Sequence, residues 1–148
     1  MIRVALAVAV LFVSTSLACA EDIRVVMEKL NEQWLNAFNT PNTAAFLDQY
    51  TEDAVLIPQE AMVPLKGPQA IREYWDGTLK VGAKNHTFQV LDAEEYGNIA
   101  YQLSSFTVDV GNTTHIAGHT MRIYEKQSDG SWKIKVHMYR YPPAPTGN

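Results

Sequence analysis

The fold is decided by residues 115–141, whose sequence is HIAGHTMRIYEKQSDGSWKIKVHMYRY. The segment holds two runs rich in β-branched and aromatic residues, and a polar turn containing Asp129-Gly130 joins them. This pattern predicts a β-hairpin. If an even number of residues forms the turn, odd-numbered residues of the first strand lie opposite even-numbered residues of the second. Opposite residues share a face, so the hairpin has one aliphatic and one polar face.

We expect the aliphatic face to be buried. It carries Ala117, Met121, Ile123, Ile134, Val136 and Met138. The other face carries Thr120, Arg122, Tyr124, Lys133, Lys135, His137 and Tyr139. His119 is an exception, because alternation places its imidazole among the aliphatic side chains, where an unpaired polar group costs about 1–3 kcal/mol. We therefore expect His119 to have a partner or a function. An odd-length turn would exchange the faces and move His119 outward.

The amino terminus has the features of a secretory signal peptide. Arg3 precedes an apolar run at 4–13, and Ala18-Cys19-Ala20 forms a cleavage site of the A-x-A type. The run is shorter than the ~20 residues that cross a bilayer, which argues against an uncleaved anchor. Cleavage after Ala20 predicts a secreted chain, extracellular or periplasmic if bacterial, without cysteine or disulfide.

The charge of the chain argues against a nucleic-acid partner. The formal net charge is -4, and loss of Arg3 with the signal peptide would make it -5. Nucleic-acid binding depends on clustered Lys and Arg, which release counterions from phosphates. Arg122, Lys133 and Lys135 share a predicted face, but three cations are typical of a solvated surface. We expect no nucleic-acid partner, and no membrane contact after signal cleavage.

Helical periodicity comes first along the chain and strand periodicity follows. Apolar residues recur at helical spacing from Ile23 to Phe38, and shorter helices are predicted at 43–50 and 67–77. Strand-like runs follow at 54–57, 86–91, 99–110, 116–124 and 132–139. This order predicts an α+β domain over 21–141, with about three helices packed on one face of a mostly antiparallel sheet. The tail 142–148 is predicted to be unstructured.

Three segments resemble a known superfamily when their order and spacing are taken together. They are WLNAFNTPNTAAFLDQYTEDAVLIP at 34–58, LKGPQAIREYW at 65–75 and SDGSWKI at 128–134. Over roughly 23–141 the chain resembles the SnoaL-like, nuclear-transport-factor-2-like superfamily. The resemblance implies a cone, in which a strongly curved sheet wraps around the helices and a pocket opens at one end. It also implies dimerisation through the sheet, so we expect a homodimer.

The superfamily includes isomerases, cyclases, dehydratases, binding modules and oligomerisation domains, so the fold alone gives no function. Ketosteroid isomerase-like members carry a tyrosine in the first helix, where this chain has Trp34. They carry a base carboxylate where this chain has Ile57 and Pro58. Proton shuttling needs a positioned base, so this mechanism is not expected. A paired carboxylate and histidine, as in the dehydratase and cyclase members, is not apparent either.

The candidate site follows from pairing the run 99–110 with the hairpin through the turn 111–114. This pairing predicts that Phe106 lies opposite His119 and that Gln102 and Ser104 share its face. Polar groups in an apolar cavity are typical of a ligand site. The predicted ligand-binding residues are Trp34, Tyr50, Gln102, Ser104, Phe106, His119 and Met138. A core histidine satisfied by Gln102 or Tyr50 is the plainer alternative.

The spacing of the histidines argues against a metal site, and two sequence motifs predict glycosylation. His115 and His119 would lie about 13 Å apart on a strand at ~3.3 Å per residue, too far to share a metal ion. We expect no metal and no cofactor. Asn85 and Asn112 begin N-x-[ST] sequences and are predicted glycosylation sites if the source is a eukaryote.

The sequence is compatible with three functions. The first is binding of a small, largely apolar ligand without chemistry. The second is a cofactor-free isomerase, cyclase or lyase with His119 as catalytic general base or acid, since imidazole titrates near neutral pH. The third is an extracellular oligomerisation or matrix module whose pocket is vestigial.

Overall fold

The computed structural model describes residues 21–40, 42–111 and 114–142. The predicted signal peptide, Asn112 and all but the first residue of the predicted tail lie outside these ranges. The helices are α1 (Ile23–Asn39), α2 (Thr43–Leu47) and α3 (Gly67–Lys80). The strands are β1 (Tyr50–Ile57), β2 (Leu65–Lys66), β3 (Ala83–Tyr96), β4 (Ile99–Val110), β5 (Thr114–Lys126) and β6 (Trp132–Arg140).

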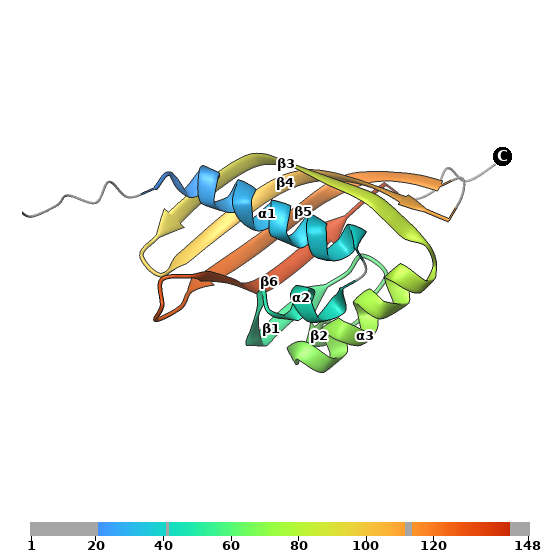
Figure 1. Ribbon diagram of the computed structural model, residues 1–148, viewed down its shortest axis with the longest axis horizontal. Helices are drawn as coiled ribbons and strands as arrows, with labels where there is room; N and C mark the ends of the chain where they lie inside the picture. Colours follow the sequence, from blue (N-terminus) through green and yellow to red (C-terminus); the bar gives the residue numbers. More distant parts are fainter. Residues whose placement is uncertain (1–20, 41, 112–113, 143–148) are drawn as a thin grey trace, which may run out of the picture.

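The strands form one six-stranded sheet in the order β2-β1-β6-β5-β4-β3. Only β1 and β6 run parallel among these neighbours; the other pairs are antiparallel. In Figure 1, α1 lies across one face of the sheet, and α2 and α3 lie beside β1 and β2. We call the face covered by α1 the inner face. The predicted α+β class, with three helices against a mostly antiparallel sheet, is confirmed.

The long helix begins and ends where its sequence pattern predicts. The side chain of Asp22 caps it by accepting from the backbone N–H of Arg24 at 2.9 Å. The side chains spaced at helical intervals, among them Met27, Trp34 and Phe38, are buried against the sheet and the other helices. In α3 the helix continues past Gly77, which was predicted to end it, and stops three residues later.

Helix packing centres on one tryptophan. Trp34 is fully buried, and its ring stacks on Phe38 with centroids 5.2 Å apart. Its edge contacts include Phe46 at 5.0 Å and Trp75 at 5.3 Å, so residues of all three helices meet there. Aromatic pairs of this geometry add about 0.5–1.5 kcal/mol beyond the burial of their area. The cluster fixes α1 and α3 relative to each other beside the inner face.

Near Met121, each face of the hairpin carries the residues that were predicted to share it. However, the buried face is the polar one and not the aliphatic one. Met121 pairs with Met138 and Arg122 with His137. Arg122 and His137 are buried, whereas Met121 and Met138 are 39% and 37% exposed. His119 is exposed as well, so its predicted place among buried aliphatic side chains is wrong. The prediction failed because α1 covers the polar face of the hairpin and supplies partners for it.

Two register details also differ from the prediction. A bulge after Ile123 pairs Tyr124 with Ile134, so Ile134 lies on the buried face together with Tyr124. Across β4 and β5, His119 lies opposite Ser105, and Phe106 lies opposite Gly118. Gln102, Ser104 and Phe106 therefore share the inner face with Thr120 and Arg122, and His119 points to the other side.

Candidate functional site

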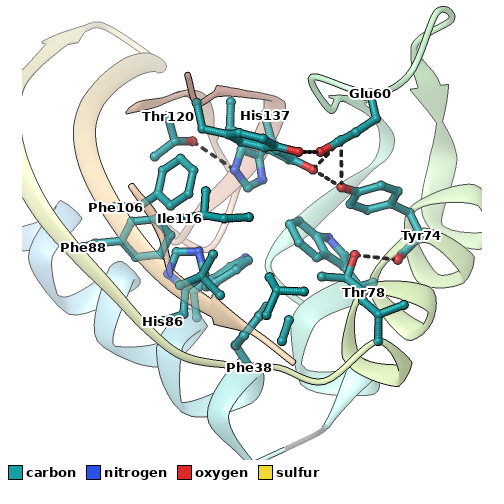
Figure 2. Close-up of a pocket in the computed structure, with 18 residues that line it drawn as sticks. Phe38, Glu60, Tyr74, Thr78, His86, Phe88, Phe106, Ile116, Thr120 and His137 are labelled. Atoms are coloured by element: carbon teal, nitrogen blue, oxygen red, sulfur yellow. Dashed lines mark hydrogen bonds between the residues drawn. The ribbon is translucent and has the colours of Figure 1, made fainter. Parts of the chain in front are cut away.

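A cavity of about 210 Å³ lies between α3 and the inner face of the sheet. Its walls come from α1, α3, the inner faces of β3, β4, β5 and β6, and the segments that flank β1 and β6. Aromatic and aliphatic side chains form most of the wall, including Phe88, Phe106 and Ile116 (Figure 2). Polar groups are gathered mainly into two clusters. Thr120 and His137 belong to one, and Glu60 and three tyrosines to the other.

The inner cluster consists of Asn31, Tyr50, Thr120, Arg122 and His137. The His137 imidazole has Nδ1 2.7 Å from the Tyr50 hydroxyl, and its Nε2 lies 3.1 Å from Thr120 Oγ1. Arg122 Nε donates to His137 Nε2 at 3.3 Å. Because a guanidinium can only donate, Nε2 must accept, and the imidazole hydrogen is on Nδ1, where it is donated to Tyr50. Both ring nitrogens of His137 are thus engaged.

Arg122 is a buried cation whose charge faces aromatic rings. Its side chain is 1% exposed, and Nη1 donates to Asn31 Oδ1 at 2.9 Å. The guanidinium carbon lies 4.9 Å from the Trp34 ring centroid and 4.4 Å from that of Phe88. Among the described residues no ion pair within 4.0 Å involves Arg122. Cation–π contact with two rings therefore takes the place of a carboxylate.

The two histidines that line the cavity, buried His137 and partly buried His86, are neutral at neutral pH. Burial, assisted by the Arg122 charge, lowers the pKa of His137 well below its ordinary value. The same causes lower the pKa of His86 to about 3. Burial also raises the pKa of Tyr50 to about 12, so its phenol stays protonated. None of these groups is poised to exchange a proton near neutral pH.

The outer cluster consists of Glu60, Tyr74, Tyr139 and Tyr141. Glu60 follows β1 and is exposed, and its carboxylate accepts from the hydroxyls of Tyr74 at 3.5 Å, Tyr139 at 3.2 Å and Tyr141. The Tyr74 and Tyr139 hydroxyls are also in hydrogen-bond contact, so one of their two hydrogens is shared between Glu60 and the neighbouring phenol. Burial and the Glu60 charge raise the pKa of Tyr74, and burial with the Glu60 hydrogen bond raises the pKa of Tyr141 to about 12. Figure 2 shows Tyr74 with its hydroxyl directed toward Glu60.

The structure brings some of the predicted site residues together and separates others. Trp34 and Phe106 line the cavity, and Tyr50 reaches it through its bond to His137. Gln102 and Ser104 are buried on the inner face outside the lining, where Gln102 Oε1 accepts from the Tyr124 hydroxyl at 2.8 Å. The remaining two lie elsewhere: they are His119, which lines a separate pocket, and Met138 on the outer face.

Sequence reasoning missed the two polar clusters. Thr120, Arg122 and His137 were placed together on one face but assigned to the outside. The available signal was a face that combined tyrosines, histidine and arginine in the last two strands, opposite a helix that carries Asn31. Glu60 had no sequence signal, because it lies in a loop and meets the tyrosines only after folding.

Other predicted features fall outside the cavity. Among residues 21–142, with the gaps stated above, no three His, Cys, Asp or Glu side chains are grouped to hold a metal ion. In the described part of the chain no helix is long and apolar enough to cross a membrane. Asn85 is exposed, has a φ of 54°, and donates to Asp109 at 2.9 Å. Glycosylation at Asn85 stays a prediction.

The family model described as a SnoaL-like domain matches residues 31–135, which is more than half of the chain. The chain belongs to the SnoaL-like domain family. A ketosteroid isomerase-like protein from Erwinia carotovora atroseptica SCRI1043 superposes with a TM-score of 0.72 at 18% identity, covering 84% of this chain and 99% of that one. An NTF2-like protein of unknown function from Pseudomonas putida KT2440 gives 0.67 at 16% identity, with coverages of 84% and 87%. At such identities the likeness concerns the fold alone.

A short sequence match links the SnoaL-like chain to much larger proteins. It is 45% identical over 42 residues to a "Probable malate:quinone oxidoreductase" from each of two Mycobacterium strains, KMS and MCS. The match covers 28% of this chain and 8% of those proteins. A match to so small a part of the oxidoreductases assigns no activity to this chain.

Proposed function

We propose that the SnoaL-like domain binds a small, largely apolar ligand in the cavity beside α3, without chemistry. The observation that supports this function is the cavity itself, about 210 Å³ in volume with mainly aromatic and aliphatic walls. Ligand sites are typically apolar concavities in which a few polar groups fix orientation. Removing apolar ligand surface from water contributes roughly 25 cal/mol per Å² toward binding.

Binding is better supported than catalysis because the lowered pKa values of His86 and His137 make both cavity histidines weak proton acceptors. His119 faces away from the cavity, so an isomerase, cyclase or lyase reaction would depend on His137 instead. The imidazole of His137 is neutral, and both of its nitrogens are already engaged. Glu60 is the single carboxylate among the described lining residues, and three phenols accompany it. This arrangement suits positioning of a ligand.

The test fills the cavity with a larger side chain at one position of β5 and uses the same substitution at the adjacent residue as the control. Ile116 lines the cavity from β5, whereas Ala117 is exposed and points the other way. Ile116→Trp should abolish binding of a small aromatic probe such as propylbenzene, measured through the fluorescence of the lining tryptophans, and Ala117→Trp should retain it. Native mass spectrometry of the purified wild type would identify any natural occupant. Equal binding by both variants, or no probe binding to the wild type, would refute the function.

The proposed setting is extracellular or periplasmic, and the proposed assembly is a homodimer. The setting is supported by the signal-peptide features of residues 1–20. The assembly is supported by Met121 and Met138, which pair across β5 and β6 and are both partly exposed on the outer face. An oligomerisation module with a vestigial pocket is the competing function, and it predicts dimerisation without ligand binding.

A further inference from the structure

The cavity wall carries a negative charge at a single residue. Among the described lining residues Glu60 is the only carboxylate, and no lysine or arginine lines the cavity. His86 and His137 are neutral at neutral pH, for the reasons given above. A ligand inside the cavity therefore meets one full charge on the wall, the carboxylate of Glu60.

Aromatic rings surround this carboxylate. Tyr139 stacks on Tyr141 with centroids 6.3 Å apart and lies 6.4 Å from Trp75, which in turn lies 5.0 Å from Tyr74. The faces of aromatic rings carry partial negative charge and attract cations. A carboxylate has about four lone-pair positions, so the three phenols leave room for a further donor. Carboxylate and rings together favour an ammonium group over a neutral or anionic one.

The inner cluster disfavours a second cation in the cavity. Arg122 lies behind Trp34, Phe88 and His137 and does not itself line the cavity. Its guanidinium repels a cation bound beside the inner cluster, while the covering rings keep it from direct contact with an anion. The two charges thus orient a ligand, with its positive group at Glu60 and its hydrocarbon part toward Phe88.

We propose that the cavity selects an apolar amine, whose ammonium group contacts Glu60 among Tyr74, Tyr139 and Tyr141. This inference rests on the proposed function, because it names the ligand class of the same cavity. Glu60 is then a specificity-determining residue. The rest of the wall binds the hydrocarbon part and is indifferent to the terminal group.

The experiment compares three probes that share a phenylethyl group and differ in the charge of the terminal group. They are 2-phenylethylamine, propylbenzene and 3-phenylpropanoate, which are cationic, neutral and anionic near neutral pH. Each is titrated into the full mature protein and followed by tryptophan fluorescence. Glu60→Gln removes the charge, and Glu52→Gln removes the same charge from an exposed β1 position outside the cavity. Circular dichroism checks that both variants are folded.

We expect the wild type and Glu52→Gln to bind the amine about tenfold more tightly than propylbenzene, with the carboxylate weakest. In Glu60→Gln the ratio of amine to propylbenzene affinity should fall close to one. Equal affinities of the wild type for amine and propylbenzene would overturn the amine proposal and leave apolar binding intact. An amine preference that persists in Glu60→Gln would overturn the role of Glu60. Failure of all three probes would overturn the binding function and the amine proposal together.

Discussion

Arg122 and His137 lie opposite each other on β5 and β6, and the guanidinium Nε donates to the imidazole Nε2 across 3.3 Å. Because that nitrogen must accept, the pair fixes the tautomer of His137 and directs its remaining hydrogen to Tyr50. The nearby positive charge also opposes protonation of the imidazole. Burial and this cross-strand contact together keep His137 neutral, and the contact also holds its ring in place, with little freedom to transfer protons.

Replacing His137 should destabilise the fold. His137→Phe keeps an aromatic ring but leaves Arg122 Nε and the Tyr50 hydroxyl short of a partner. An unsatisfied buried polar group costs about 1–3 kcal/mol, so we expect a loss of about 2–4 kcal/mol in the free energy of unfolding. Urea denaturation measures it. The control His119→Phe changes an exposed ring, so its free energy of unfolding should stay within about 0.5 kcal/mol of the wild-type value. Similar losses in the two variants would show that His137 does not satisfy Arg122 and Tyr50.

Stability should fall as the solution is acidified. The pKa of His86 is about 3 and that of His137 lies well below 6.5 in the folded protein, while both are near 6.5 in the unfolded chain. Between these values the unfolded state binds more protons. The free energy of unfolding therefore decreases with falling pH, by at most about 1.4 kcal/mol per pH unit for each histidine.

The range from about pH 7 to about pH 5 isolates this effect, because carboxylates titrate mainly below it. Urea denaturation across the range gives the slope directly. His86→Phe keeps the aromatic contacts of the ring with Phe88 and Phe106 but removes one titrating group, so the slope should become shallower. A wild-type stability that is constant or rises on acidification would show that the histidines are not held neutral.

Much of the fold follows from the sequence. Helical spacing between Ile23 and Phe38 located α1, and the strand-like runs at 86–91, 99–110, 116–124 and 132–139 located β3, β4, β5 and β6. That Met121 and Met138 share a face was also predicted, although the turn between Lys126 and Trp132 holds an odd number of residues and the bulge after Ile123 restores the predicted alternation. These features are local, because they are set by residues close together in the chain.

The buried side of the hairpin was not predictable in the same way. Alternation separates two faces but does not say which one a helix covers. Here the aliphatic face is outside, and Arg122 is inside because Asn31, Trp34 and Phe88 supply an acceptor and two ring faces from distant segments. The cost of burying a guanidinium depends on those partners, which a strand pattern does not contain. His119 was misplaced for the same reason.

Gly118 should not tolerate a side chain. It is buried on the inner face of β5 opposite Phe106, and a Cβ there would lie 2.8 Å from two carbons of the Phe106 ring. The same Cβ would lie even closer to the backbone carbonyl oxygen of Arg140, which cannot move independently of β6. Overpacking of this kind costs about 1–3 kcal/mol, so Gly118→Ala should lower the free energy of unfolding by that amount.

Thermal or urea unfolding of Gly118→Ala measures the loss. Gly77→Ala is the matched control, because its Cβ would meet nothing within 4 Å and the position is inside α3. Alanine is favoured over glycine in helices by about 1 kcal/mol, so the control should gain stability. If Gly118→Ala were as stable as the wild type, β5 and β6 would have to be less tightly apposed than the structure shows.

The outer face of the sheet should mediate dimerisation if the chain assembles as proposed. Met121 lies between Leu103 on β4 and Met138 on β6, so apolar side chains cross three strands on that face. A glutamate in the middle of such a surface would be desolvated without a partner. Met121→Glu should therefore convert the dimer to a monomer in sedimentation velocity, at concentrations where the wild type is dimeric. Val25→Glu, at an exposed position on α1, should remain dimeric; a monomeric wild type, or a dimeric Met121→Glu, would exclude this interface.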